Sequence, residues 1–360
     1  MDTAPIKLTS ARAWRTYIGG SQIDAIHGIE GSQDTLFPEE WIMSIVSARN
    51  AGREHIKDEG MSFLEGRGVS LKDYIAADPA ATLGAEHAEK LGATTGVLVK
   101  IIDAGERLTI QAHPSKVKAP ILFNSPFGKT ECWHILGGRE IGGEKPCIYM
   151  GFKEGITRQR WKEIFDTQDI PAMLDALHKF PVQPGETYLI CGGVPHAIGA
   201  GCLLVEIQEP TDYTVRTERI TPNGLKIADA QCHQGLGFEK MFDVFEYDEL
   251  SYAEAYSKWC IPPVTLEENE NYIRREVIGY QQTSCFRMER YDISGHCVFP
   301  ESHRFTGLYI LSGKGTLEDT EGCRNVSGGD QFFVPATSKA FTITAQGSPI
   351  TLFRCFGPEL

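Results

Sequence analysis

The sequence predicts a mainly β protein in which short strands and glycine-rich turns build jelly-roll barrels. β-branched and apolar residues gather in short segments, and turn residues separate these segments roughly every 8 to 12 residues, a spacing typical of sandwiches and jelly rolls. Hydrophobic residues make up 41% of the chain and charged residues 23%, as in ordinary folded proteins. The length of 360 residues favours two domains at roughly 150 residues each.

Helical patterns are fewer and interrupt the strands. The segment 83–96 has a helical pattern, and 157–179 repeats its apolar residues with a period near 3.6. Between them, residues 97–110 predict a β-hairpin. We therefore expect a helical insertion at 153–182, and we expect the polar helical region 53–95 to act as a cap.

The C-terminal hundred residues predict a small double-sheet barrel. GLYILSGKGTLED, GGDQFFVPA and KAFTITAQG give strands that are joined by tight glycine turns. We accordingly expect an N-terminal catalytic barrel from residues 1–150 with 183–285, which includes the region 53–95. A second barrel should span 286–360.

The net charge and the spacing of the cysteines indicate which partners the protein can bind and in which cellular compartment it occurs. The chain has 35 basic and 48 acidic residues, a net charge of -13 that disfavours nucleic acid and anionic membranes. No apolar run approaches the roughly 18 residues that a membrane span needs. The ten cysteines form no C-x-x-C pair, which indicates reduced thiols. We expect a cytoplasmic protein, and an anionic ligand would need a few well-placed cations.

A first candidate site lies in LTIQAHPSK. Gln111 and His113 are two residues apart on an expected strand, so both side chains point to the same face, together with Thr109. Ile110 and Ala112 would face the opposite packing layer. Taken alone, the pair is explained more simply by an ordinary half-exposed strand that faces solvent.

Two further segments supply potential metal ligands. In FGKTECWHIL, Glu131 is a carboxylate among apolar neighbours, and its burial requires a positive partner unless it lies on a solvated edge strand. His196 lies in a glycine-rich turn before an apolar strand, where a structural histidine is the simpler interpretation. Combined with Gln111 and His113, they form a mixed nitrogen and oxygen set that suits zinc or a similar divalent ion.

Charged residues follow His196 closely. Glu206 interrupts the apolar strand LLVEIQ, where alternation puts it on one face with Leu204 and Gln208. Asp212 and Arg216 come next. Arg216 and Lys129 are candidate clamps for an anion, although surface ion pairs would explain any one of these charges.

The chain resembles the type I mannose-6-phosphate isomerases, which are cupin proteins. The resemblance rests on three segments in the family's order and spacing: VLVKIIDAGERLTIQAHPSK, FGKTECWHIL and GGVPHAIGAGCLLVEIQEPTDYTVR. It implies two cupin-type barrels and one zinc ion per chain. The implied zinc ligands are Gln111, His113, Glu131 and His196. The implied substrate contacts are Arg216, Lys129 and Thr109, and Glu206 and Asp212 match acidic positions that line the pocket.

The resemblance implies interconversion of mannose 6-phosphate and fructose 6-phosphate through an enediol. This reaction needs a base near C1 and C2 and a positive group at the developing oxyanion. Glu206, Asp212 and a zinc-bound hydroxide all remain candidate bases, and Asp212 and Arg216 are expected nearest the chemistry. Two alternatives stay open: a non-catalytic metal-binding cupin that senses sugars, and an isomerase of another phosphosugar. The sequence does not indicate an oligomeric state.

Overall fold

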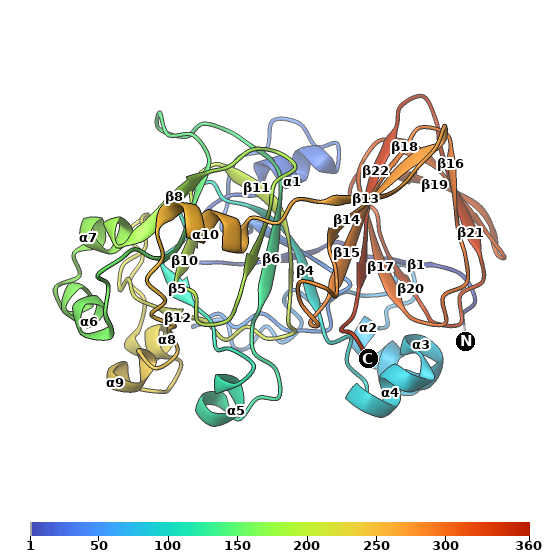
Figure 1. The fold of residues 1–360 in the computed structure, drawn as a ribbon. Helices are drawn as coiled ribbons and strands as arrows, with labels where there is room; N and C mark the ends of the chain where they lie inside the picture. Colours follow the sequence, from blue (N-terminus) through green and yellow to red (C-terminus); the bar gives the residue numbers. More distant parts are fainter. Residues whose placement is uncertain (1) are drawn as a thin grey trace.

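The computed structural model describes residues 2–360 as four antiparallel sheets stacked in layers, with helices on the outside (Figure 1). Two of the four sheets, one with six strands and one with five, form the left-hand lobe of Figure 1. The six-stranded sheet has the order β2 (Ala11–Ala13), β3 (Glu39–Ile42), β4 (Leu98–Asp103), β11 (Cys202–Gln208), β6 (Glu131–Gly138) and β9 (Thr187–Ile190). The five-stranded sheet has the order β12 (Val215–Arg216), β5 (Gln111–Ala112), β10 (His196–Ile198), β7 (Cys147–Phe152) and β8 (Leu177–Pro181).

The other two sheets form the right-hand lobe. The seven-stranded sheet has the order β1 (Ile6–Leu8), β20 (Gln331–Val334), β17 (Thr306–Ser312), β22 (Ile350–Phe356), β15 (Arg287–Ile293), β14 (Tyr272–Ile278) and β13 (Val264–Glu268). The four-stranded sheet has the order β16 (His296–Phe299), β21 (Phe341–Ala345), β18 (Lys314–Asp319) and β19 (Gly322–Ser327). The mainly β prediction is confirmed, but these sheets are open, with two edge strands each, and closed barrels are not confirmed.

The helices are short and lie outside the sheets. They are α1 (Ser21–Ile26), α2 (Leu71–Ala77), α3 (Pro79–Leu83), α4 (Ala85–Leu91), α5 (Lys118–Phe123), α6 (Arg158–Thr167), α7 (Ile170–Asp175), α8 (Asp229–His233), α9 (Phe238–Met241) and α10 (Tyr252–Trp259). The helix expected over 157–179 is interrupted, because Gln168 takes a left-handed conformation with φ 51° and Pro171 follows. Within residues 2–360, no helix has both the length and the apolar character needed to span a membrane.

Strand alternation explains the layers. On β11, Leu204 packs in the core between the five- and six-stranded sheets, whereas Val205 and Ile207 pack in the core shared with the seven-stranded sheet. Ile110 and Ala112 pack against the helical layer, as their expected orientation requires. The two lobes are therefore continuous, since one hydrophobic core joins the six-stranded sheet to the seven-stranded sheet.

Chain connections differ from the expected ones in two places. The segment 97–110 is not a hairpin, because β4 and the following strand β5 belong to different sheets. Parts of the N-terminal region also lie against the C-terminal lobe: β1 pairs with β20, and the Ala336 N–H donates to the Thr82 carbonyl near α3 (Figure 1). The boundaries 1–150 with 183–285, 153–182 and 286–360 remain a proposal.

Candidate metal centre and its cavity

Three buried side chains converge between the five- and six-stranded sheets. His113 follows β5, His196 begins β10, and Glu131 begins β6. The Nε2 atoms of the two histidines are 3.1 Å apart, and Glu131 Oε1 is 3.1 Å from His113 Nε2. Glu131 Oε2 is 3.7 Å from His196 Nε2. Their ligand atoms form the one cluster of three His, Cys, Asp or Glu donors close enough to hold a metal among residues 2–360.

Backbone carbonyls fix the protonation of both imidazoles. His113 Nδ1 donates to the Tyr213 carbonyl at 2.8 Å, and His196 Nδ1 donates to the Val194 carbonyl at 2.8 Å. A carbonyl oxygen can only accept, so each Nδ1 carries the proton and each Nε2 presents a lone pair. Burial, followed by the nearby Lys129 ammonium, lowers the pKa of His113 to about 3, which keeps its ring neutral.

The cluster therefore contains more hydrogen-bond acceptors than donors. Both oxygens of Glu131 are buried without a hydrogen-bond partner. The Lys129 ammonium lies 3.2 Å from His113 Nε2 and forms an ion pair with Glu131 Oε1 at 2.9 Å. Burial would raise the pKa of Glu131, but the charge of the neighbouring Lys129 ammonium outweighs burial and lowers it. His196 Nε2 and Glu131 Oε2 still face only acceptors, and a divalent cation fits that arrangement.

Gln111 is close to the cluster without a direct contact to it. It is paired in register with His196 across β5 and β10, and its side chain lines the cavity that Glu131 and Lys129 also border. Thr109 borders the same cavity and is buried. The expected ligand and substrate residues thus lie together between the five-stranded and the six-stranded sheets.

Glu206 lies next to the cluster on the six-stranded sheet, which also holds Glu131. It faces the cavity from β11, where Gln208, two residues on, is paired with Glu131 of β6. Lys100 Nζ lies 2.9 Å from Glu206 Oε1, and the Trp133 indole N–H donates to Oε2 at 2.9 Å. Burial raises the pKa of Glu206, as does the neighbouring charge of Glu131.

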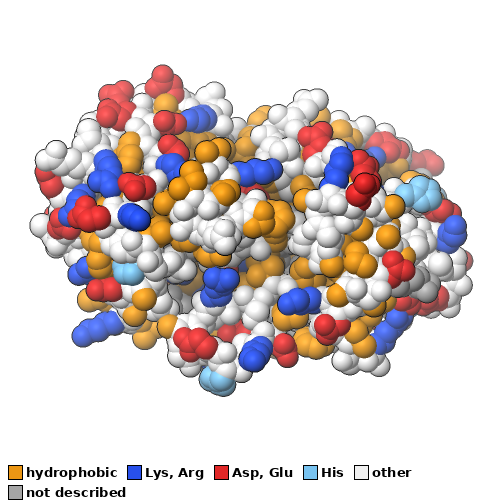
Figure 2. Space-filling model, turned by 90° about the horizontal axis from the view of Figure 1, so that it is seen from below, with side chains coloured by type: hydrophobic (Ala, Val, Ile, Leu, Met, Phe, Trp, Pro, Cys, Tyr) orange, Lys and Arg blue, Asp and Glu red, His pale blue; other side chains and the backbone are white. Residues whose placement is uncertain are grey.

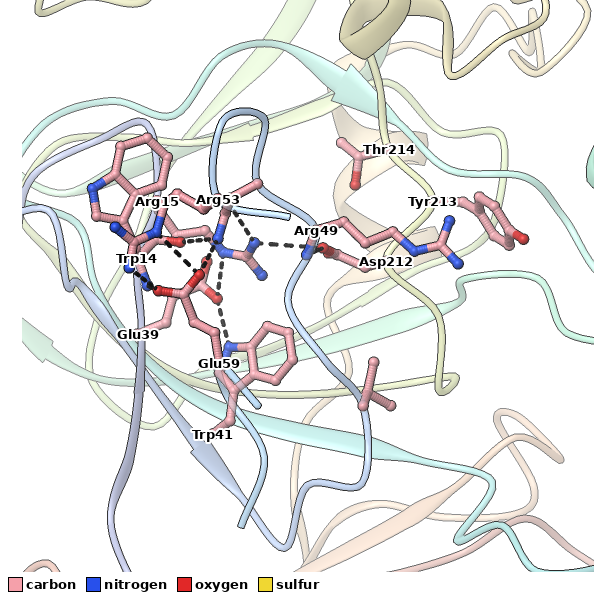
Figure 3. Close-up of polar contacts among 12 residues, drawn as sticks. Trp14, Arg15, Glu39, Trp41, Arg49, Arg53, Glu59, Asp212, Tyr213 and Thr214 are labelled. Carbon is pink, nitrogen blue, oxygen red and sulfur yellow. Dashed lines mark hydrogen bonds and ion pairs between the residues drawn. The ribbon is translucent and has the colours of Figure 1, made fainter. Parts of the chain in front are cut away.

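Asp212 has a different environment from Glu206. Arg15 bridges it to Glu39, with contacts of 3.4 Å to Asp212 and 2.9 Å to Glu39, as Figure 3 shows. The Arg49 backbone N–H also donates to Asp212 at 3.2 Å. Burial would raise the pKa of Asp212, but Arg15 dominates and holds it below its usual range.

Arg216 reaches the cavity from β12 without a carboxylate partner. Its guanidinium donates to the carbonyls of Thr214, at 3.2 Å, and Gln231, at 3.3 Å, and it forms no ion pair within residues 2–360. Burial lowers its pKa. A buried cation with free donors is suited to an anionic ligand. On the face seen in Figure 2, by contrast, basic and acidic side chains are interspersed and form no single-sign patch.

Sequence reasoning missed several charged residues of this cavity, among them Lys100, Arg15 and Glu39. Lys100 had a signal, because it is the one charged residue in the apolar stretch VLVKII. Lys100 of β4 is directly paired with Glu206 of β11, so it provides the cation that a buried carboxylate requires. Arg15 and Glu39 carry no comparable signal, since both lie beside other polar residues.

The fold and the cluster together define a mainly β protein with a buried site for a divalent metal. The family model for the mannose-6-phosphate isomerase cupin domain matches residues 277–353. A probable mannose-6-phosphate isomerase, GmuF of Bacillus subtilis, is 27% identical over 265 residues, which cover 72% of this chain and 76% of the relative. The mannose-6-phosphate isomerase of Streptococcus mutans is 27% identical over 272 residues, with coverage of 73% and 77%.

The whole fold also has a close structural counterpart. The crystal structure of the Bacillus subtilis mannose 6-phosphate isomerase superimposes with a TM-score of 0.72 over 98% of this chain and 99% of that one, at 22% identity, which shows a shared fold. In sequence and in fold, the chain is thus similar to the cupin-type mannose-6-phosphate isomerases. The cupin prediction is confirmed.

Proposed function

We propose that this protein is a zinc-dependent isomerase that interconverts mannose 6-phosphate and fructose 6-phosphate. Its similarity to named mannose-6-phosphate isomerases supports an aldose–ketose isomerase by class. The observation that carries the proposal is the set of inward-facing lone pairs on His113, His196 and Glu131, beside a cavity with an unpaired arginine, Arg216.

The proposed metal ligands are Gln111, His113, Glu131 and His196. Two neutral imidazoles, one carboxylate and one amide oxygen form a nitrogen and oxygen set that zinc accepts, with one ion per chain. When bound, zinc supplies positive charge beside the oxygens on C1 and C2 of the sugar. The chain's own contribution is to hold both imidazoles in the required tautomer through the Tyr213 and Val194 carbonyls.

We assign proton transfer between C1 and C2 to Glu206. It is the one carboxylate within β11, it borders the cavity, and it lies two residues from Gln208, the register partner of the proposed ligand Glu131. Asp212 is held by Arg15 and the Arg49 N–H, which suits it to positioning rather than to accepting a proton. Asp212 thus remains part of the catalytic site as a support.

The substrate's phosphate is the group that Arg216 would bind. Thr109 can donate its hydroxyl to a sugar oxygen from the same wall of the cavity. Lys129 lies between the metal cluster and Thr214, so it is suited to an oxygen near the reacting carbons. The acidic chain as a whole still disfavours nucleic acid as a partner, and a cytoplasmic location remains part of the proposal.

A coupled assay that follows fructose 6-phosphate formation from mannose 6-phosphate tests the proposal directly. We expect turnover by the purified protein, loss of turnover after chelation, and recovery when zinc is restored. Metal bound without turnover of any sugar would favour the sugar-sensing alternative. Turnover of a different phosphosugar, with none of mannose 6-phosphate, would favour the other isomerase.

A further inference from the structure

We propose that Arg49, on the loop 43–62, is a second phosphate-binding residue that makes this site specific for phosphorylated sugars. The inference rests on the proposed function and adds a residue to it. Arg49 borders the inner cavity and also the outer cavity that opens beyond it, and Arg216 and Asp212 border both as well. The two cavities are thus continuous past Arg49.

The basic residues of the inner cavity fall into two groups. Four of them have a carboxylate partner: Arg15 with Glu39 and Asp212, Lys100 with Glu206, Arg107 with Glu218, and Lys129 with Glu131. Two have none within residues 2–360, Arg49 and Arg216. Because the paired cations are already neutralised, the attraction for an incoming dianion comes from Arg49 and Arg216.

Arg49 is held in place without being neutralised. Its guanidinium lies over the ring of Tyr213 at 5.0 Å, and that ring packs against Phe123 with centroids 4.8 Å apart. Its backbone N–H is tied to Asp212 at 3.2 Å. Figure 3 shows the side chain extended toward Tyr213, away from the cluster around Glu59. Stacking leaves the N–H groups at the edge of a guanidinium available, so they can bind phosphate oxygens.

The rest of the loop is anchored by other residues. Arg53 forms an ion pair with Glu59 at 2.7 Å, and the Asn50 amide donates to Glu59 at 3.0 Å and to the Trp14 carbonyl at 2.8 Å. These contacts hold the loop without using the side chain of Arg49 (Figure 3). Arg49 is therefore free to bind a ligand, whereas Arg53 acts in the structure of the loop.

The test compares Arg49→Gln and Arg49→Lys with Lys57→Gln in the zinc-loaded protein. Lys57 is an exposed cation of the same loop that borders only the outer cavity, so its loss matches the change in charge. We expect Arg49→Gln to raise the KM for mannose 6-phosphate about tenfold, with kcat within about twofold and zinc content unchanged. Arg49→Lys should recover part of the loss, and Lys57→Gln should change KM by less than about twofold.

Binding of inorganic phosphate, measured by calorimetry, provides a second readout. We expect Arg49→Gln to weaken phosphate binding by a factor similar to its effect on KM. If wild type binds phosphate but turns over no mannose 6-phosphate, the proposed function fails and the calorimetry still decides the role of Arg49. Unchanged phosphate affinity in Arg49→Gln, or a larger loss in Lys57→Gln, would overturn the inference.

Discussion

His113 and His196 face each other with their Nε2 atoms 3.1 Å apart, and neither nitrogen carries a proton. Two lone pairs at this distance repel unless a cation lies between or beside them. The five-stranded sheet nevertheless holds both imidazoles there, since each ring is fixed by a hydrogen bond to a main-chain carbonyl. This arrangement supports the proposed metal site, and the first prediction follows from it.

Replacing His196 with Ala should abolish stoichiometric metal binding. The change removes one lone pair and leaves the Glu131 carboxylate with fewer partners. Metal at 100 times its Kd stabilises a folded protein by about 2.7 kcal/mol, so the variant should also lose the rise in Tm that zinc gives wild type. Elemental analysis and thermal unfolding with and without zinc measure both effects. One equivalent of zinc in the variant would contradict the ligand assignment.

Glu206→Gln should lower kcat by roughly 10²- to 10⁴-fold, the usual contribution of a general acid–base group. The amide keeps the size of the side chain and can still accept from Trp133, but it cannot take a proton. Zinc content should be unchanged. Asp212→Asn is the matched comparison, and a smaller fall in its kcat is expected. If Asp212→Asn lost more turnover than Glu206→Gln, the roles of the two carboxylates would have to be exchanged.

Removing Arg216 should weaken substrate binding without removing the metal. A hydrogen bond to a charged group contributes on the order of 1.5 to 3 kcal/mol, so Arg216→Ala should lose roughly ten- to hundredfold in kcat/KM. Steady-state kinetics on mannose 6-phosphate and on mannose separate the two contributions. Wild-type activity in this variant, or equal use of the free sugar, would refute the phosphate assignment.

Lys100→Met should destabilise the protein strongly. The change leaves Glu206 buried without its cation, and breaking a buried pair in this way costs about 3 to 5 kcal/mol. Lys90→Met is the control, because Lys90 pairs with Glu86 at 3.0 Å on the exposed face of a helix, where such a pair contributes less than about 1 kcal/mol. Urea unfolding of both variants measures the difference. Equal losses would show that burial does not strengthen the Lys100 pair.

The His27–Glu40 contact should make stability depend on pH. His27 Nε2 lies 2.7 Å from Glu40 Oε2, and this hydrogen bond raises the pKa of His27 above 6.5. A group whose pKa is higher in the folded state adds stability below its unfolded pKa and loses that contribution as pH rises through the folded value. Wild type should therefore lose stability relative to His27→Gln as the pH is raised above 6.5, as urea unfolding at several pH values would show. A constant difference would exclude this linkage.

Strand periodicity accounts for most of what the sequence predicted correctly. Alternation along each strand predicted which face Gln111 and Glu206 occupy, and both border the cavity. That rule needs only local sequence. Lys129 was predicted as an anion clamp, and its contact with Glu131 could not be anticipated. Whether an ammonium meets a ligand or a neighbouring carboxylate depends on where the preceding loop places it.

The unpredicted part of the site comes from segments that are distant in the chain. Arg15 follows β2 and Asp212 follows β11, two strands of the six-stranded sheet that are not neighbours, and no local pattern encodes the contact between them. The path of 97–110 shows the same limitation. Residues 98–103 and 111–112 each form strands, but the crossing from one sheet to the other depends on packing in both cores.

The pairing of β1 with β20 has a consequence for biosynthesis. Ile6 lies opposite Phe333, so β1 has no partner in the sheet until β20 has been translated. During that time its apolar residues remain available to chaperones and to other nascent chains. Removal of β1 would uncover the edge of β20, whereas removal of β22 would separate β17 from β15 in the middle of the sheet.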